Sequence, residues 1–357
     1  MRDCVKFQLP PTLKVHMTPL DRHTAAPAEE MHDLIFGAWI TQAITAVADL
    51  GVADALAGGP LPIDELATRV GANPDALRRL LRLLISRGIF AQRNDGRYQL
   101  TPLADVLRSD APVSMAAMAR LIGAPQHREH WSLLTEAIKT GASVYPTLRG
   151  KSYFDYMSDE PEFGHLFNDA MTSASGLEIG PVVDACDFTQ YRTIVDVAGG
   201  HGSLLAAILA SAPNAQGVLY DLPDVVAGAT PLLEEKRVAE RVRLVGGSFF
   251  DDVPAGGDAY VLKHIIHDWD DDASVQILRN VRTAATPGAV VLLVESVVPE
   301  DDSRSNAKLL DMEMLIANNG RERTAGEYRR LFDEAGFQMV GVVDTASPCS
   351  IIEARMA

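Results

Sequence analysis

Short apolar segments alternate with longer segments of mixed polarity along the second half of the chain. Each apolar segment is rich in β-branched residues and is followed by a turn or a helical pattern, which is typical of strands in a doubly wound α/β sheet. Ligands bind at the carboxyl ends of the strands in such a sheet. We predict five strands before a helix over 325–335 and two strands after it. The strand segments are 194–197, 217–220, 242–245, 259–262, 289–294, 337–343 and 350–354.

The first half of the chain is patterned as helices. Apolar residues recur at helical spacing over 31–57, with a break at Gly51, and they fall on more than one face of the predicted helix. A helix with several apolar faces is expected to be buried between partners, so we predict a homodimer through this segment. The apolar residues are Leu34, Ile35, Trp39, Ile40, Ile44, Val47 and Leu50.

Two helices and a hairpin are predicted between residues 62 and 100. Asn73 and Pro74 are typical of a helix start, and Gly88 is typical of a helix end. An Asn-Asp-Gly turn between two short apolar segments then predicts the hairpin. This order is that of a winged helix, a unit that most often reads DNA, and a transcriptional regulator is therefore an alternative reading.

The charge of the chain argues against that alternative. The formal net charge is −16, with 47% hydrophobic and 22% charged residues, as in an ordinary globular protein. An acidic chain repels the phosphate backbone, so we expect no nucleic-acid partner. The arginines of the predicted recognition helix then cover the polar face of an amphipathic helix; they are Arg78, Arg79, Arg82 and Arg87.

Three cysteines, Cys4, Cys186 and Cys349, are far apart in sequence and show no metal-binding spacing. The first 30 residues contain charges and prolines where a signal peptide would have an unbroken apolar core. No apolar run approaches the length of a membrane span. These features predict a cytoplasmic protein without a membrane partner.

The patterns divide the chain into three parts. Residues 1–28 are expected to form a flexible N-terminal arm, and residues 29–112 a winged-helix-like dimerisation domain. Residues 113–357 are expected to form the α/β domain, which begins with a helical, methionine-rich segment over 113–177. Such a segment could form a linker and the wall of a pocket. Methionines that only fill the core would explain it equally well.

A glycine-rich turn follows the first predicted strand of the α/β domain. Gly199, Gly200 and Gly202 allow the backbone to approach a ligand closely, and the following helix points free N–H groups at that ligand. The third small residue of a dinucleotide fingerprint is missing, while acids end this strand (Asp196) and the next one (Asp221). An acid at the second position can hold the hydroxyls of an adenosine ribose, so S-adenosylmethionine (SAM) fits better than NAD.

Taken together, these motifs resemble those of the SAM-dependent O-methyltransferases, in the branch of caffeic acid-type, acetylserotonin and bacterial natural-product tailoring enzymes. The resemblance extends from about residue 30 to the C-terminus, and it implies an N-terminal domain that serves dimerisation. The order of the motifs is specific, although each motif alone is not. They are Asp196 to Gly202, Tyr220 to Pro223, Leu262-Lys263, His267 to Trp269, Val294 to Ser296 and Glu322 to Thr324.

The resemblance implies a set of residues that bind SAM and its product S-adenosylhomocysteine. The glycines would approach the methionine part, Asp221 would hold the ribose, and the residues after it would surround the adenine. Two positions depart from the family pattern, because Ala198 and His201 stand where glycine and a small residue are common. The implied cofactor-binding residues are Asp196, Gly199, Gly200, Gly202, Asp221, Leu222, Ser248, Phe249 and Lys263.

The resemblance also implies the catalytic residues. His267 would be the general base, oriented by Glu295 and Glu322, and histidine is a natural base for a phenol at neutral pH. His264 is the competing histidine and is expected to be structural. Methyl transfer needs alignment rather than a metal, so we expect no catalytic metal. The implied acceptor-facing residues are Phe154, Phe167, Met171, Met312 and Asn318.

The acceptor is expected to be a small aromatic metabolite with a phenolic hydroxyl. Two readings remain open from the sequence beside this O-methyltransferase. One is a SAM-binding relative with altered chemistry, such as a hydroxylase or a decarboxylase. The other is the winged-helix regulator.

Overall fold

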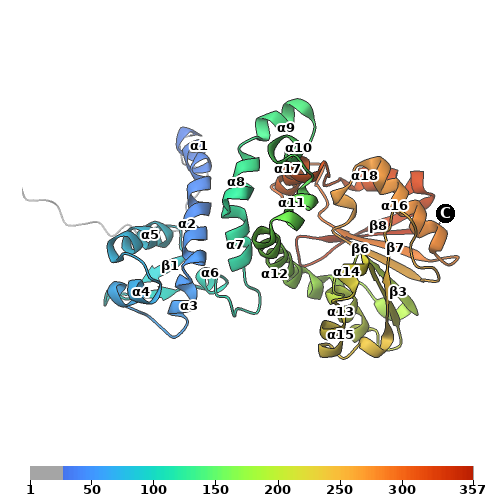
Figure 1. Cartoon of the computed structure of the whole chain (residues 1–357), viewed down its shortest axis with the longest axis horizontal. Coiled ribbons are helices and arrows are strands. Elements are labelled where there is room, and N and C mark those ends of the chain that lie inside the picture. The colour runs from blue at the N-terminus through green and yellow to red at the C-terminus, as the bar shows by residue number, and fades with distance from the viewer. Residues whose placement is uncertain (1–26, 357) are drawn as a thin grey trace, which may run out of the picture.

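The computed structural model describes residues 27–356 and contains a helical N-terminal unit and a large α/β unit (Figure 1). The arm predicted over residues 1–28 lies almost wholly outside the described residues, and the first helix, α1, already begins at Pro27. No helix among residues 27–356 is long and apolar enough to span a membrane.

The N-terminal unit has its own apolar core, built from its helices and one hairpin. Its order of helices followed by a hairpin is the predicted one. Asn73 caps α5 by accepting hydrogen bonds from the N–H groups of Asp75 and Ala76, and Gly88 has a φ of +74°. The elements are α1 (Pro27–Ile35), α2 (Gly37–Asp49), α3 (Val52–Leu56), α4 (Ile63–Arg69), α5 (Pro74–Ser86), β1 (Phe90–Gln92), β2 (Tyr98–Leu100) and α6 (Pro102–Asp105).

The segment predicted as one helix with a break is divided twice. Gly51 provides the expected break, with a φ of +64° between α2 and α3. A second break, at Phe36, was not expected: its backbone, with φ −78° and ψ 0°, separates α1 from α2. Helix α1 buries no residue in the chain, and Trp39 at the start of α2 is 67% exposed. The apolar face predicted for a partner is therefore unpaired within one chain.

A layer of helices lies between the N-terminal unit and the sheet, where α7 runs beside α12 and α8 continues from α7 in Figure 1. Helix α7 packs against both α2 and α12, so it connects the two units. This layer is the predicted helical segment. Its members are α7 (Ala116–Gly123), α8 (Pro125–Trp131), α9 (Leu134–Thr140), α10 (Tyr145–Arg149), α11 (Tyr153–Asp159) and α12 (Pro161–Ala185).

The α/β unit is built on a seven-stranded sheet in the order β5-β4-β3-β6-β7-β9-β8. The first five strands in this order are parallel, and β9 is antiparallel to both β7 and β8. Each strand lies where the apolar pattern predicted it. The strands are β3 (Thr193–Val197), β4 (Gln216–Asp221), β5 (Val242–Gly246), β6 (Ala259–Lys263), β7 (Val290–Glu295), β8 (Phe337–Asp344) and β9 (Ser350–Met356).

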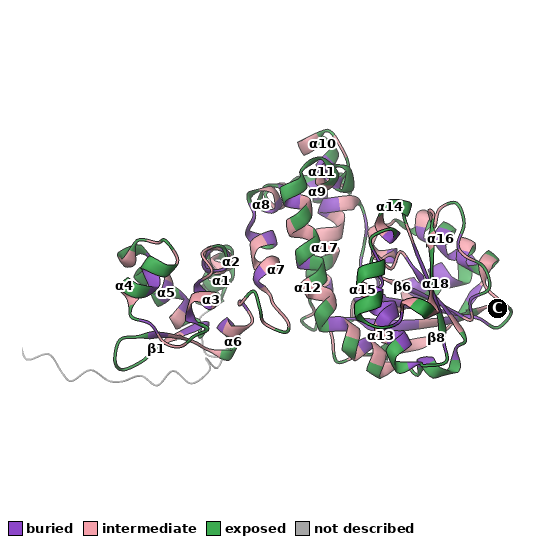
Figure 2. Ribbon diagram, turned by 60° about the horizontal axis from the view of Figure 1, so that its bottom comes forward, coloured by how far each residue is buried: buried purple, intermediate pink, exposed green. Residues whose placement is uncertain are grey.

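Helices cover both faces of the sheet, which explains why its central strands are apolar throughout. Side chains of α12, α13 and α15 pack on one face, and side chains of α16 and α18 pack on the other. Every residue of β7 is buried, and Figure 2 shows the sheet largely in the buried colour beneath exposed helix faces. The remaining helices are α13 (Ser203–Ser211), α14 (Pro223–Val226), α15 (Thr230–Glu235), α16 (Asp271–Ala284), α17 (Ala307–Asn318) and α18 (Ala325–Ala335).

Candidate active site

The glycine turn after β3 is held in a left-handed conformation. Gly200 and Gly202 have φ of +59° and +83°, and Ala198 has a φ of +56°, which is unfavourable for a residue with a Cβ. A Cβ on Gly199 would lie 2.4 Å from Asp196 and 2.6 Å from Leu219. A Cβ on Gly200 would meet no atom within 4 Å, so the loop leaves open space on that side. The loop therefore has a closed underside and an open side where a ligand can approach.

Asp221 at the end of β4 joins this loop to the next one. Its Oδ2 accepts a hydrogen bond from the N–H of Gly200 at 2.8 Å, and its Oδ1 accepts one from the N–H of Leu222 at 2.7 Å. A carboxylate has about four acceptor sites, so capacity remains for ligand hydroxyls. Leu222 is exposed beside it. This geometry fits the ribose and adenine of SAM.

Asp196 occupies a different place from the other predicted cofactor residues. It is 1% exposed, and its Oδ2 has no hydrogen-bond partner among the described residues. Burial, with a smaller contribution from Asp221, raises the pKa of its carboxyl to about 7, against the charge of Lys263. Asp196 thus lies under the glycine loop and supports it from below, away from the loop's open side.

The predicted adenine-side residues lie after β5. The Ser248 hydroxyl accepts a hydrogen bond from the N–H of Phe250 at 3.3 Å, which shapes the turn. The Phe249 ring packs edge to face against Phe250 and against Trp269, with centroids 4.9 and 6.0 Å apart. The aromatic group fixes the loop after β5 against the loop that carries His267.

Lys263 at the end of β6 belongs to a buried polar group that the sequence did not predict. Its Nζ donates to Ser175 Oγ at 3.0 Å and to Glu178 Oε2 at 3.1 Å, both on α12. His264 Nε2 lies 3.0 Å from the same Glu178, and the Cys349 Sγ lies 3.3 Å from it. Burial alone would raise the pKa of Glu178, but His264 and Lys263 lower it to about 2. Glu178 therefore carries a negative charge that compensates Lys263.

The position of His264 agrees with the structural role expected for it. Its backbone has a φ of +55°, and its ring stacks on that of His267 with centroids 5.0 Å apart. Its Nε2 is hydrogen-bonded to the carboxylate of Glu178. No sequence signal linked Glu178 to this site, because it lies on a helix far upstream with no motif around it.

His267 lies in a short 3-10 turn, Ile266–Asp268, directly after β6. Its Nδ1 is 2.8 Å from Glu322 Oε1, which is the expected hydrogen bond. The hydrogen bond expected from Glu295 is absent: the nearest oxygen, Oε2, is 3.6 Å away. The other oxygen, Oε1, instead accepts from the N–H groups of Ile265 and Ile266. Glu295 therefore holds the backbone of the turn and acts on His267 only through its charge.

Three carboxylates surround the imidazole of His267. Burial alone would lower the pKa of His267, but Glu295, Asp268 and Glu322 outweigh burial and raise it to about 10. The Nε2 atom faces Asp268 Oδ1 at 3.6 Å, and that carboxylate accepts a hydrogen bond from Asn318 Nδ2 at 2.8 Å. Asn318, which was predicted to face the acceptor, thus lies on the Nε2 side of His267, and Asp268 separates the two.

Arg323 and Gly320 allow the loop that carries Glu322 to pack closely against the turn of His267. Arg323 is fully buried and donates to the carbonyls of Ile266 and Trp269 at 2.9 and 2.8 Å, and to Asp271. A Cβ on Gly320 would lie 2.1 Å from the carbonyl oxygen of His267. The motif that precedes α18 signalled this loop, but the buried role of Arg323 comes only from the tertiary structure.

The other acceptor-facing residues come from the helical layer and from α17. Phe154 and Phe167 each contact the ring of Tyr153, with centroids 5.6 and 5.8 Å apart. Phe154 and Met171 are exposed, at 40% and 37%. Met312 lies on α17, the helix that ends with Asn318.

The acidic run 270–272 lies at the start of α16. Asp270 caps α16 by accepting a hydrogen bond from Ala273 N at 2.9 Å, and Asp271 pairs with Arg323. Neither of these two acids is directed at a ligand.

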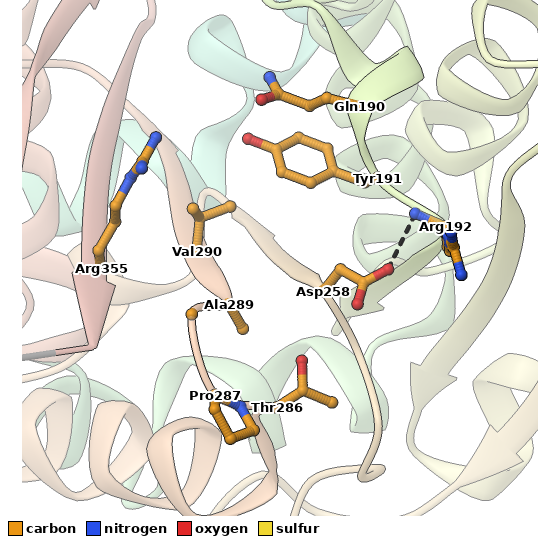
Figure 3. A pocket seen from close by; sticks show the side chains of 10 residues that line it. Gln190, Tyr191, Arg192, Asp258, Thr286, Pro287, Ala289, Val290 and Arg355 are labelled. Carbon is orange, nitrogen blue, oxygen red and sulfur yellow. Dashed lines mark hydrogen bonds between the residues drawn. The ribbon is translucent and has the colours of Figure 1, made fainter.

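A separate pocket lies at the amino ends of the strands, opposite the carboxyl ends (Figure 3). It has a volume of about 410 Å³ and is lined by residues that precede β3, β6 and β7, with Arg355 from β9. Its acid, Asp258, accepts hydrogen bonds from the N–H groups of Arg192 and Thr193 and so caps β3. This pocket is remote from the carboxyl ends of the strands, where the predicted residues gather.

Comparison with known proteins identifies the same two units. A family model described as O-methyltransferase domain matches residues 131–338, and one described as O-methyltransferase dimerisation domain matches residues 32–110. The phenazine O-methyltransferase PhzM of Lysobacter antibioticus is 41% identical over 340 residues, covering 95% of this chain and 99% of PhzM. The mitomycin biosynthesis 6-O-methyltransferase of Streptomyces lavendulae is 36% identical over 350 residues, covering 97% of this chain and 100% of that enzyme.

A solved structure gives the same picture. CalO1, described as a methyltransferase in calicheamicin biosynthesis in its SAH-bound form, superposes with a TM-score of 0.85 at 35% identity. The match covers 92% of this chain and 98% of CalO1.

Proposed function

The chain belongs to the SAM-dependent O-methyltransferases, and we propose that it methylates a phenolic hydroxyl of a small aromatic metabolite with His267 as the general base. The observation that carries this proposal is the largely buried His267, held by Glu322 at a strand end beside the glycine loop. Both parts of the site lie at the carboxyl edge of one parallel sheet, where this fold binds its ligands.

The residues around the glycine loop would hold SAM. Asp221 would accept hydrogen bonds from the ribose hydroxyls, and Leu222, Ser248 and Phe249 would border the adenine. Gly199, Gly200 and Gly202 would lie along the methionine part, with Asp196 supporting the loop from below. Lys263 would meet the nucleoside from the end of β6, with its charge compensated by Glu178. When bound, SAM supplies a methyl group on a positively charged sulfur, which makes that methyl electrophilic.

His267 would take the proton of the acceptor hydroxyl on its Nε2 atom. Nδ1 is engaged by Glu322, so that carboxylate fixes the ring orientation, as the acid of a catalytic triad does. The pKa of His267, about 10, matches that of a phenol, also about 10, so the proton can pass between them with little change in free energy. The three carboxylates then stabilise the imidazolium while the phenolate oxygen is alkylated.

The acceptor would lie between the helical layer and α17. Phe154, Phe167, Met171 and Met312 would contact an aromatic ring, and Asn318 with Asp268 would fix its polar edge. Apolar walls with a few oriented polar groups are typical of sites for small aromatic molecules. This arrangement favours a flat aromatic acceptor over an extended one.

The N-terminal unit would join two copies of the chain. Its exposed apolar residues at α1 and the start of α2 form a stripe that includes Met31, Leu34, Ile35 and Trp39. Burial of such a stripe against a second copy removes apolar surface from water. We place the domain boundaries as the sequence suggested, with the dimerisation unit at 29–112 and the methyltransferase unit at 113–357. We also propose that the N-terminal unit is winged-helix-like but binds no nucleic acid, because the chain is acidic, and that the protein acts in the cytoplasm.

A labelling experiment tests the proposal. Purified protein is incubated with SAM carrying an isotopically labelled methyl group and with a panel of hydroxyphenazines and hydroxybenzoates, and the products are analysed by mass spectrometry. We expect at least one acceptor to gain the labelled methyl on oxygen, and we expect this gain to be lost in the His267→Gln variant. A product that is hydroxylated or decarboxylated without a labelled methyl would establish the altered chemistry instead. Calorimetry with S-adenosylhomocysteine, run in parallel, reports cofactor binding separately.

A further inference from the structure

A second cluster of histidine and carboxylate side chains lies outside the His267 site, between α8 and α17. His127 and His130 are three residues apart on one face of α8, and Glu313 faces them from α17. His127 is 5% exposed and His130 is fully buried. Two imidazoles and one carboxylate therefore converge in a nearly dry space between two helices.

The distances in this cluster are longer than those of good hydrogen bonds. His127 Nε2 is 3.4 Å from Glu313 Oε2, and His130 Nε2 is 3.3 Å from Glu313 Oε1, whereas N–H···O bonds cluster at about 2.9–3.0 Å. His130 Nε2 has no hydrogen-bond partner among the described residues, although it is buried. The ring centroids of the two histidines are 4.6 Å apart. A buried, unpartnered nitrogen is thus directed at the middle of the cluster.

These distances fit a tetrahedral metal ion. Zinc binds imidazole nitrogen and carboxylate oxygen at about 2.0–2.2 Å, so two ligand atoms on one tetrahedral ion lie about 3.3–3.5 Å apart. Each imidazole nitrogen lies at about that spacing from one of the two oxygens of Glu313, His127 Nε2 from Oε2 and His130 Nε2 from Oε1. One ligand atom from each of the three side chains can be chosen so that all lie within 4.8 Å of one another.

The groups around the cluster hold its members as the outer partners of a metal site do. The Tyr145 hydroxyl is 2.9 Å from His130 Nδ1, so it engages the ring nitrogen opposite the one that faces Glu313. The Trp131 indole N–H donates to the Glu313 carboxylate. His130 and Glu313 are therefore each held by a partner outside the cluster.

The geometry points to a site for a divalent transition-metal ion of the zinc type, bound by His127, His130 and Glu313, with the fourth position of the tetrahedron left to a small ligand such as water. Two imidazoles with a carboxylate suit zinc rather than magnesium or calcium, which prefer oxygen ligands. By coordinating residues of both helices, the ion would link α8 to α17, the helix that carries Met312 and Asn318. It takes no part in the methyl transfer, and the inference does not depend on the identity of the acceptor.

The other histidine-containing groups offer a useful contrast. At His264 the distance to Glu178 is 3.0 Å, the length of an ordinary hydrogen bond, and Lys263 already supplies a positive charge. At His267 the Nδ1 atom is bonded to Glu322 at 2.8 Å. The shortest contact in each of these groups is an ordinary hydrogen bond, although His264 Nδ1 and Glu295 Oε2 are also without a partner there. In the cluster of His127, His130 and Glu313, both imidazole-to-carboxylate distances are longer.

Metal titration of the tag-free, full-length protein tests the site. After dialysis against a chelator, zinc chloride is titrated by calorimetry, and cobalt(II) is added separately so that its visible spectrum reports a tetrahedral environment. We expect one equivalent of zinc bound with a Kd in the micromolar range or tighter, and zinc at 100 times Kd should shift the unfolding equilibrium about 100-fold toward the folded state. His130→Gln and Glu313→Gln should each weaken binding at least 100-fold.

Two matched variants serve as controls. His165→Gln removes an exposed histidine of α12 and should leave zinc binding unchanged. His264→Gln tests whether the ion binds in the neighbouring group instead. The inference is overturned if saturable binding is absent, if Kd exceeds the micromolar range, or if binding is lost in His264→Gln but kept in His130→Gln. Circular dichroism checks the fold of each variant, and Glu313→Gln decides the matter if His130→Gln is unfolded.

Discussion

The Nδ1 atom of His267 lies 2.8 Å from Oε1 of Glu322, and both side chains are largely buried. The two residues come from different loops, one after β6 and one before α18, and Arg323 binds the two loops together. This pair fixes the ring and leaves Nε2 directed toward Asp268 and Asn318. On the proposed function, this contact sets the side of the imidazole on which an acceptor hydroxyl would dock.

Loss of the imidazole should slow turnover without affecting cofactor binding. A general base typically contributes about 100- to 10,000-fold, so His267→Gln should reduce kcat by about that range. His264→Gln, the matched control, should reduce kcat much less, because its ring is paired with Glu178. Single-turnover rates with an identified acceptor, alongside calorimetry with S-adenosylhomocysteine, check both variants. Near-native turnover by His267→Gln would mean that proximity alone drives the reaction.

Glu322 should control the protonation of His267. Replacing Glu322 by Gln removes one of the charges that raise the pKa, so the pKa of His267 should fall from about 10 toward that of an ordinary imidazole. Titration of the ¹⁵N-labelled imidazole by NMR checks this without an acceptor. An unchanged pKa in Glu322→Gln would contradict the assigned role.

The same shift predicts a pH dependence of activity and of stability. Because the base acts in its deprotonated form, kcat/KM of the wild type should rise from pH 7 toward pH 10. The folded state binds the proton of His267 more tightly than the unfolded state, whose pKa is about 6.5. Its contribution to stability is therefore complete below about pH 6.5 and is lost as the pH rises through about 10. Chemical denaturation at several pH values should show this loss in wild type and a smaller one in His267→Gln.

Asp221 should be required for cofactor affinity. Its carboxylate joins Gly200 to Leu222 and is placed for the ribose hydroxyls, and a hydrogen bond to a charged group contributes about 1.5–3 kcal/mol. Asp221→Asn should therefore weaken S-adenosylhomocysteine binding about 10- to 100-fold. Asp224→Asn changes an exposed acid on α14 nearby and should have little effect. Calorimetry on the three proteins makes the comparison, and equal affinities would remove Asp221 from the site.

Ala198 should store backbone strain in the glycine loop. Its left-handed φ of +56° costs an L-residue about 1–2 kcal/mol, and glycine loses about 0.5–1 kcal/mol through its greater freedom when unfolded. Ala198→Gly should therefore raise the free energy of unfolding by up to about 1.5 kcal/mol. Ala207→Gly, within α13, should lower it by about 1 kcal/mol. Urea denaturation measures both, and a destabilised Ala198→Gly would show that the alanine methyl contributes packing that outweighs the strain.

The exposed apolar stripe on α1 and α2 should hold the dimer together. Trp39 is 67% exposed in the single chain, so Trp39→Glu would place a charge in the contact between copies and should convert the dimer to a monomer at micromolar concentration. Val340→Glu alters another exposed apolar residue, on β8 in the α/β unit, and should remain dimeric. Light scattering distinguishes the two. A wild-type monomer would remove the premise.

The sequence by itself determined the strands, the glycine turn and the segment that contains His267. These features are local: β-branched runs predict strands, three close glycines predict a ligand-binding turn, and the patterns need no knowledge of distant residues. The second break, at Phe36, was not predicted although Gly37 follows it directly, because the helical spacing of the apolar residues continues across it. The apolar stripe around Trp39 was also visible in sequence, although which residues stay exposed depends on the packing of α1.

Tertiary structure alone decided which polar groups meet. Glu295 and Glu322 look alike in sequence, but packing puts Glu322 on the imidazole and Glu295 on the backbone of the same turn. Asp196 is a strand-end acid like Asp221, yet the loop covers it and burial raises the pKa of its carboxyl. Glu178 meets Lys263 across 85 positions, and Glu313 meets His130 from a helix near the other end of the chain. Charge and burial depend on neighbours in space, and for pairs so distant in sequence only the folded chain defines those neighbours.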